Sequence, residues 1–163
     1  IRERRTGRRT RCQLGNWPIH PMTVDAFDAD VLIYAAVPGH TLGRRVRYLF
    51  PAEATSSTGE IAGIGSVLLI PELLSKPLRD GAESEVEALA ALLGRLDLRP
   101  LDEATAELAA ALGAAHNLRA ADAVHLATAV AAGADRFITN NTSDFKKAIT
   151  EVEVVYPEEL PEP

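Results

Sequence analysis

Two carboxylates, Asp28 and Asp30, interrupt the apolar segment AFDADVLIYAA at residues 26–36. Burying an unpaired carboxylate costs enough free energy that the group normally becomes neutral or finds a partner. Two interpretations follow from the residues alone. The pair can form an Asx turn at an exposed strand end, or it can face a cation that serves the function of the protein.

Three further acids lie at comparable points of the predicted structure. Glu72 follows a predicted strand and starts a helix, Asp122 lies in the first turn of a predicted helix, and Asp144 follows another predicted strand. In open parallel sheets, ligands bind at the carboxyl ends of the strands, near the point where the strand order reverses. We therefore expect these three acids and Asp28 to converge on one cleft, although they are 44, 50 and 22 positions apart along the chain.

Each acid also has a purely structural interpretation. Glu72 and Asp122 can stabilise a helix N-terminus through the helix dipole, which contributes about 0.3–1 kcal/mol. Asp144 can cap a helix at residues 145–148. A single explanation covers all of them, however, because clustered carboxylates repel one another unless protons or a hard divalent cation neutralise them. Mg²⁺ and Mn²⁺ prefer such oxygen ligands, whereas one Cys and four scattered His do not favour zinc.

The elements that would position these acids alternate between strands and helices. Asp102 is expected to cap a helix, Thr41 to cap another, Ser84 and Glu87 to form a capping box, and Gly133 to end a helix. The predicted strands are 24–28, the apolar run 61–74 up to Pro71, 96–101, 135–139 and 151–157, and the predicted helices include 31–36, 41–50 and the apolar segment 120–134. This alternation is typical of βα units around a parallel sheet, so the predicted fold class is α/β.

The chain divides by charge at Met22, its only methionine. Residues 1–21 hold six of the 17 Lys and Arg residues and one acid, and we expect them to be a basic extension that is disordered or derived from upstream sequence. A nucleic-acid-binding arm is the alternative. Residues 22–163 are predicted to be one domain, with 11 basic and 22 acidic side chains.

Composition narrows the classes of function. A domain with a net charge of −11 does not bind polyanions through its overall field, so a nucleic-acid ligand would need metal ions or a local basic patch. With one Cys, no intrachain disulfide can form. Because no apolar run is long enough for a membrane span or a signal peptide, we expect a cytoplasmic protein without membrane contact.

Three segments resemble the signature blocks of PIN-domain ribonucleases, in particular the VapC-type toxins of toxin–antitoxin pairs. They are AFDADVLIYA, SVLLIPELL and LRAADAVHLATAVAAGADRFITNNTSDF, and the resemblance extends from about Val24 to Pro157. The last block is the most specific, because an Asp-x-x-His-Leu-Ala helix is followed by a strand and by Thr-x-Asn-x-x-Asp-Phe. The resemblance implies a three-layer α/β/α sandwich around a central parallel sheet.

The resemblance also implies roles for individual residues. The catalytic, metal-binding acids would be Asp28, Glu72, Asp122 and Asp144, holding Mg²⁺ or Mn²⁺. Residues expected to line the same cleft are Asp30, Thr139 and Asn141, and Asp30 departs from the Ser, Thr or Asn that is commoner in the family. His125 can serve as a general base or as a buried, hydrogen-bonded residue, and its apolar surroundings favour the second role.

The implied activity is metal-dependent hydrolysis of RNA phosphodiester bonds by the toxin of a type II toxin–antitoxin pair. The implied partners are an RNA substrate, an antitoxin and a second copy of the chain. Candidate contacts to RNA phosphates are Arg44, Arg45, Arg47, Arg119, Lys146 and Lys147. Two alternatives are a catalytically silent PIN-like module that binds protein and a metal-dependent phosphatase, although no Gly-rich phosphate loop supports the latter.

Overall fold

The computed structural model describes residues 23–50 and 61–162 and places five strands in one parallel sheet. The strands are β1 (Asp25–Phe27), β2 (Gly63–Ser66), β3 (Leu96–Arg99), β4 (Arg136–Ile138) and β5 (Glu153–Val155). Their spatial order is β3-β2-β1-β4-β5. Strands β2 and β3 follow one another on one side of β1, and β4 and β5 follow one another on its other side. The strand order therefore reverses between β1 and β4, where open parallel sheets bind their ligands.

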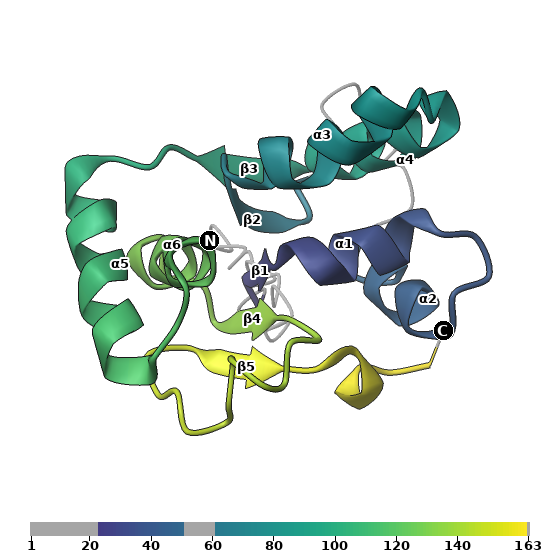
Figure 1. Ribbon diagram of the computed structural model, residues 1–163. Helices are drawn as coiled ribbons and strands as arrows, with labels where there is room; N and C mark the ends of the chain where they lie inside the picture. Colours follow the sequence, from purple (N-terminus) through teal and green to yellow (C-terminus); the bar gives the residue numbers. More distant parts are fainter. Residues whose placement is uncertain (1–22, 51–60, 163) are drawn as a thin grey trace, which may run out of the picture.

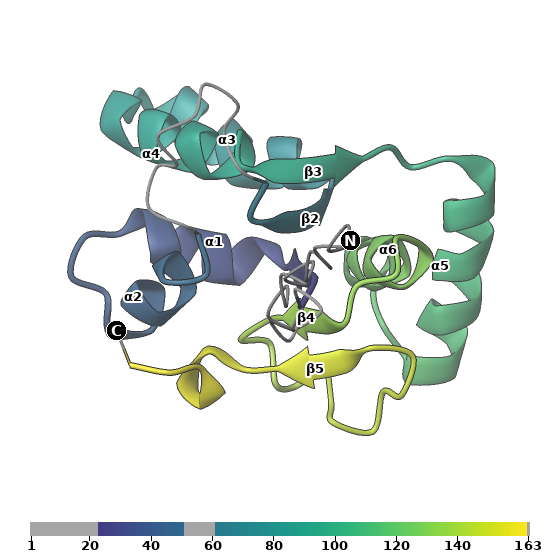
Figure 2. The same ribbon diagram turned by 180° about the vertical axis from the view of Figure 1, so that it is seen from behind.

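Helices cover both faces of this sheet (Figures 1 and 2). The pair α5 and α6 lies together on one side of the molecule, and the other four helices lie on the opposite side. Their bounds are α1 (Ala29–Ala36), α2 (Thr41–Arg47), α3 (Leu69–Asp80), α4 (Glu83–Leu93), α5 (Glu103–His116) and α6 (Ala120–Ala131), and the 3-10 turn η1 (Pro157–Glu159) follows β5.

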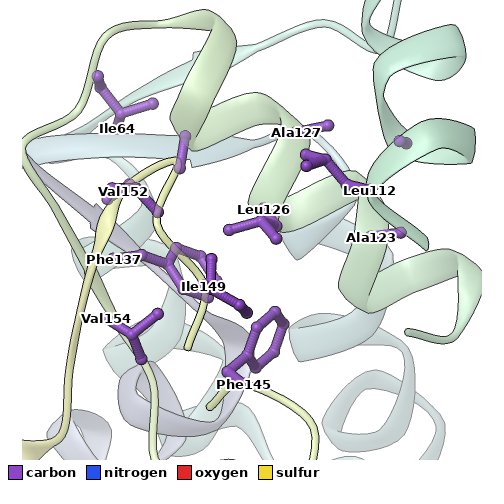
Figure 3. Close-up of a cluster of buried hydrophobic side chains, with 13 residues drawn as sticks. Ile64, Leu112, Ala123, Leu126, Ala127, Phe137, Phe145, Ile149, Val152 and Val154 are labelled. Carbon is purple, nitrogen blue, oxygen red and sulfur yellow. The ribbon is translucent and has the colours of Figure 1, made fainter. Parts of the chain in front are cut away.

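Alternating strand residues build one apolar core on each face of the sheet. In β1, Ala26 packs toward α5 and α6, whereas its neighbour Phe27 packs toward α1–α4. Phe137 and Ile138 of β4 alternate in the same way. Figure 3 shows the first core, in which Leu126 of α6 is fully buried. Burying one such Leu or Phe side chain contributes about 1.5–3 kcal/mol. The two cores make a three-layer α/β/α sandwich, which confirms the predicted fold class.

Several local predictions are also confirmed. The strand expected within residues 96–101 is β3. Asp102 caps α5, because its carboxylate accepts the N–H of Thr105 at 2.8 Å. Gly133 directly follows the C-cap of α6 with a φ of 70°, the left-handed conformation that glycine adopts without strain.

The extent predicted for the buried strand before Glu72 was wrong. β2 ends at Ser66, whose hydroxyl accepts the N–H of Leu68 at 3.2 Å, and α3 begins at Leu69. Pro71 therefore lies within the first turn of α3 and does not open it. The apolar run continues past the strand because Leu69 also faces the core, from the helix. Glu72 consequently lies in the first turn of α3 rather than at a strand end.

Two predicted helix starts were also wrong. α4 begins at Glu83 and its N-cap, Ala82, offers no side-chain hydrogen bond, so Ser84 already lies inside the first turn. The reason is the short connection, since Gly81 ends α3 with a φ of 67° and leaves one residue before α4. α2 is capped by His40 instead of Thr41, because the His40 Nδ1 accepts the N–H of Gly43 at 3.1 Å.

The prediction for residues 1–21 lies outside the described residues, as does Met22. Within residues 23–50 and 61–162, no helix is long and apolar enough to cross a membrane.

Candidate active site

Asp28 lies directly after β1 and is the N-cap of α1, which begins at Ala29 and not at Val31 as expected. One carboxylate oxygen accepts the N–H of Ala29 at 2.8 Å, and the other accepts the hydroxyl of Thr139 at 2.7 Å. Thr139 follows β4, the neighbour of β1, and is fully buried, while Asp28 is 5% exposed. Burial raises the pKa of Asp28, and the two hydrogen bonds offset part of that rise. Neither partner brings a positive charge.

Asp30 lies in the first turn of α1, so the expected turn over residues 28–30 is replaced by helix. Its carboxylate accepts the N–H of Asn140 at 3.1 and 3.3 Å, and the Asn140 side chain donates to the Tyr34 hydroxyl at 3.3 Å. Burial, with the charge of Asp28 as the next cause, raises the pKa of Asp30 to about 6. Asp30 thus joins α1 to the loop after β4.

Asp144 lies in a turn after β4, and residues 145–148 do not form the helix that it was expected to cap as an alternative. The side chain of Asn141 holds it instead. The amide Nδ2 donates to the Asp144 carboxylate at 2.9 Å, and the Asn141 Oδ1 accepts the N–H of Asp144 at 3.2 Å. The N–H of Asn141 donates to the Thr139 hydroxyl at 3.1 Å. One chain of hydrogen bonds therefore connects Asp28, through Thr139 and Asn141, to Asp144.

Asp122 lies in the first turn of α6 and is half-buried. Its side chain has no hydrogen-bond partner among the described residues. Burial raises the pKa of Asp122, and the charges of Asp28, Asp144 and Glu72 raise it further, while His125 acts in the opposite direction. Asp122 is therefore close enough to each of the other three predicted acids to be repelled by its charge.

Glu72 reaches the cluster from α3 and contacts His125 of α6. The Glu72 Oε2 and the His125 Nε2 are 2.5 Å apart. The histidine is 3% exposed, which confirms the expectation of a buried, hydrogen-bonded residue. Burial lowers the pKa of His125, but the hydrogen bond to Glu72 and the charges of Asp28, Glu72 and Asp122 outweigh burial and raise it above its usual value.

The chemistry of these donors fits a hard divalent cation, because the side chains that converge here end in carboxylate oxygens. Within the described parts of the chain, however, no three His, Cys, Asp or Glu side chains are arranged to hold one metal ion. Mg²⁺ typically retains several waters and takes only one or two carboxylates from the protein, so it does not need such a closed cage. Burial is the main cause of the raised pKa values of Asp28, Asp30 and Asp122, and the charges of neighbouring acids raise them further.

Two features of the site escaped the sequence analysis. The first is Asn140, whose backbone N–H holds Asp30, and the second is the contact between Glu72 and His125. The loop sequence places Asn140 beside the predicted Asn141, and His125 shares a helix face with Asp122. The sequence offers no other signal for these two features, because one involves a backbone N–H and the other joins residues that are 53 positions apart.

The basic residues proposed to contact RNA fall into two groups. Three are bound to the protein itself, because each donates to backbone carbonyl oxygens: Arg45, Arg47 and Lys147. Three are exposed, and their side chains have no hydrogen-bond or ion-pair partner in the described structure: Arg44, Arg119 and Lys146. Of the second group, Arg119 is the N-cap of α6 and Lys146 follows Asp144 by two residues, so both flank the acidic cluster.

The fold and this acidic edge define an α/β/α protein with its candidate site at the switch point of a parallel sheet. The PIN domain family model matches residues 26–149, and the chain belongs to this family. No curated protein matches the sequence.

Two solved structures share the fold. One, described as a toxin–antitoxin complex from Klebsiella pneumoniae, is 24% identical with a TM-score of 0.63, and the match covers 83% of this chain and 98% of that one. The other, described as VapBC2 from Rickettsia felis bound to a DNA fragment from its promoter, is 15% identical with a TM-score of 0.60, covering 82% and 98%.

Proposed function

We propose that this protein is a metal-dependent ribonuclease and the toxin of a type II toxin–antitoxin pair. One observation carries the nuclease part: the charges of Asp28, Asp144 and Glu72, from three other segments, all act on Asp122, in a protein whose strand order reverses between β1 and β4. Membership of the PIN domain family supports a nuclease, and the toxin–antitoxin complexes among the structural neighbours support the toxin.

The proposed site contains Asp28, Glu72, Asp122 and Asp144, which would hold Mg²⁺ or Mn²⁺. A bound ion of this kind supplies a water with a lowered pKa and offsets the negative charge of a phosphorane-like transition state. The chain itself fixes two of the carboxylates, because Thr139 donates to Asp28 and Asn141 donates to Asp144. These hydrogen bonds restrict the rotamers of two acids before any substrate binds.

Arg119 and Lys146 are the proposed contacts to the RNA backbone. They flank the acidic cluster and are not engaged by the protein, whereas Lys147, beside Lys146, donates to the Val154 carbonyl and the Glu159 carboxylate. Phosphate contacts of this type position a nucleic acid without reading its bases. An acidic domain can accept RNA if such local cations act together with metal ions.

The proposed partners are an antitoxin, which would neutralise the toxin, and a second copy of the chain. One structural neighbour is described as a toxin–antitoxin complex, and the other as VapBC2 bound to a DNA fragment from its promoter. A toxin that cleaves cellular RNA would act in the cytoplasm.

Cleavage of a broad RNA panel by the purified protein tests the proposal. We expect hydrolysis with Mg²⁺ or Mn²⁺ that EDTA abolishes, and growth arrest when the chain is expressed in cells. Asp122→Ala should remove both while circular dichroism shows an unchanged fold. Glu107→Gln is the matched control, because it removes one negative charge from the exposed surface of α5.

The outcomes separate the proposed function from its main alternative. RNA that stays intact with either metal contradicts the nuclease and favours a silent PIN-like module that binds a protein partner. A neighbouring reading frame that encodes a short DNA-binding protein is expected for a toxin. Loss of growth arrest through unfolding of Asp122→Ala, seen by circular dichroism, would not support the proposed role of Asp122.

A further inference from the structure

His125 lies beneath the acidic cluster, one turn after Asp122 on the same face of α6. Its side chain is enclosed by the protein, and its Nε2 lies 2.5 Å from the Glu72 Oε2. The charges of three carboxylates act on this one ring, those of Asp28, Glu72 and Asp122. No other imidazole takes part in the hydrogen bonds of the described site.

His125 is poorly placed to act as a general base. Its Nε2 is already engaged by Glu72, and its Nδ1 is buried without a hydrogen-bond partner among the described residues. A general base must come within hydrogen-bond reach of the proton that it removes, directly or through one water. An enclosed ring with one nitrogen occupied and the other shielded does not meet this requirement.

Glu72, in contrast, depends on His125 for its orientation. The Asp28 carboxylate accepts two hydrogen bonds, from the Ala29 N–H and the Thr139 hydroxyl, and Asp144 is held at two points by Asn141, which donates to its carboxylate and accepts its backbone N–H. The Glu72 carboxylate has His125 as its sole partner within the described structure, and about a third of its side chain is exposed. A long side chain with one anchor retains considerable rotamer freedom if that anchor is removed.

We propose that His125 is a positioning residue that orients Glu72 for a divalent cation. The Nε2–H donates to Oε2 and fixes the plane of the carboxylate, which leaves Oε1, without a partner in the described structure, to face the ion. This inference rests on the proposed function, because the cation is part of that proposal. What it predicts, however, is the affinity for the metal and not the rate of cleavage. Hydrogen bonds that orient metal-binding side chains typically change metal affinity 10- to 100-fold when they are lost.

Mn²⁺ binding to the full chain tests this inference, with Mn²⁺ alone as the probe and calorimetry or electron paramagnetic resonance as the measurement. We expect His125→Leu to weaken binding about 10-fold. In a Glu72→Gln background, the same substitution should change the affinity less than about twofold, because both changes remove one interaction. Thr128→Val is the matched control: Thr128 is buried one turn later on α6, and in the described structure its hydroxyl donates only to the carbonyl of Val124, so loss of the hydroxyl should leave Mn²⁺ affinity unchanged.

Two further measurements keep the inference testable if His125→Leu does not fold. His125→Gln retains a side-chain N–H donor, so it should bind Mn²⁺ more tightly than His125→Leu. If His125→Leu does not fold, the Mn²⁺ affinity of His125→Gln is compared with that of the wild type and should be close to it. In the metal-free protein, the ¹⁵N resonance of His125 Nε2 should shift in Glu72→Gln and stay in place in Thr128→Val. An unshifted resonance in Glu72→Gln would overturn the inference.

The remaining outcomes distinguish this inference from the proposed function. The positioning role alone is overturned if His125→Leu binds Mn²⁺ as tightly as the wild type does. It is also overturned if the effects of His125→Leu and Glu72→Gln on Mn²⁺ affinity are additive. Wild-type protein that neither binds Mn²⁺ nor cleaves RNA overturns the proposed function, and the positioning role with it.

Discussion

The two ends of the β1–β4 pair each bury a carboxylate, but the two carboxylates have different hydrogen-bond partners. At the start of the strands, Asp25 is 6% exposed and Arg136, its register partner on β4, binds both of its oxygens at 2.7 and 2.9 Å. At the far end, Asp28 is 5% exposed but is paired with the neutral hydroxyl of Thr139. Two neighbouring strands thus bury two carboxylates three residues apart, and within the described structure only Asp25 is hydrogen-bonded to an arginine or a lysine.

This difference separates a structural carboxylate from a candidate functional one. A bidentate guanidinium compensates the desolvation of Asp25, and this contact is the first cause of the raised pKa of Arg136. Asp28 has no guanidinium partner in the described structure, and its two hydrogen bonds and the charge of His125 offset only part of the effect of burial on its pKa. A carboxyl group with a pKa raised by burial and by other acids is a feature of functional sites.

The largest effect that we expect is the loss of RNA cleavage in Asp28→Asn. Asparagine keeps one acceptor oxygen, which can still cap α1, while its amide Nδ2 would donate to the Thr139 hydroxyl oxygen where the carboxylate accepted from it, and the negative charge is removed. RNA cleavage should fall about 1000-fold or more, which corresponds to about 4 kcal/mol of transition-state stabilisation. The melting temperature should stay equal or rise, because a buried charge is lost. RNA cleavage assays and thermal unfolding measure the two effects, and retained cleavage would contradict the catalytic role of Asp28.

Asp25→Ala should have the opposite profile. It leaves the guanidinium of Arg136 three-quarters buried and unpaired. Breaking a fully buried pair costs about 3–5 kcal/mol, so we expect a loss of about 2–3 kcal/mol in the free energy of unfolding. Cleavage by the folded protein should change less than twofold.

The exposed pair of Asp97 and Arg99 on β3 provides the matched control for Asp25→Ala. Asp97→Ala should lower the free energy of unfolding by less than about 1 kcal/mol. Urea unfolding compares the two variants. If both variants lose the same free energy of unfolding, the buried ion pair at the start of β1 contributes no more stability than the exposed pair on β3.

The stability of the metal-free protein should depend on pH through Asp30. Its pKa of about 6 when folded exceeds the ordinary value of 3.8, so the folded state binds the proton more tightly. Stability should therefore fall as the pH rises from about 4 to about 6 and then level off. Asp30→Asn should flatten this slope and stabilise the protein at pH 7, by at most about 3 kcal/mol for a shift of this size.

Urea unfolding in EDTA from pH 4 to pH 8 measures this dependence. Asp80→Asn is the control, because Asp80 is an exposed acid that pairs with Lys76 on the surface of α3. A wild-type slope that Asp30→Asn leaves unchanged would assign the pH dependence to other groups.

The smallest expected effect is on Arg119→Ala, which tests whether the exposed cations beside the acids bind substrate. We expect RNA binding to Asp28→Asn protein to weaken about 3- to 10-fold, more strongly at low salt, because one phosphate contact is lost. Arg79→Ala, at the far end of α3, is the matched control because Arg79 is exposed and pairs with Asp80. Equal effects of both substitutions would indicate that overall charge, and not position, sets RNA affinity.

The sequence supported the fold class because the signals for it are local. Alternating strands and helices, the cap at Asp102 and the glycine at Gly133 all act over a few residues. The boundaries that it missed depend on packing: Leu69 is equally apolar in a strand or in a helix, and only its place in the core shows that α3 has already begun. For the same reason, Glu72 was expected to follow a strand directly and to start a helix, and only its place at the start of a helix is confirmed.

For the candidate site, the acids were predicted from residue types, their order along the chain and the resemblance to the PIN-domain family. Spacing between predicted elements places carboxylates at the ends of parallel strands, and that rule depends on topology alone. The partners of those acids required the folded chain. Whether a carboxylate meets Arg136, Thr139 or His125 is decided by side chains more than 50 positions away, at distances of 2.5–2.9 Å that only packing sets.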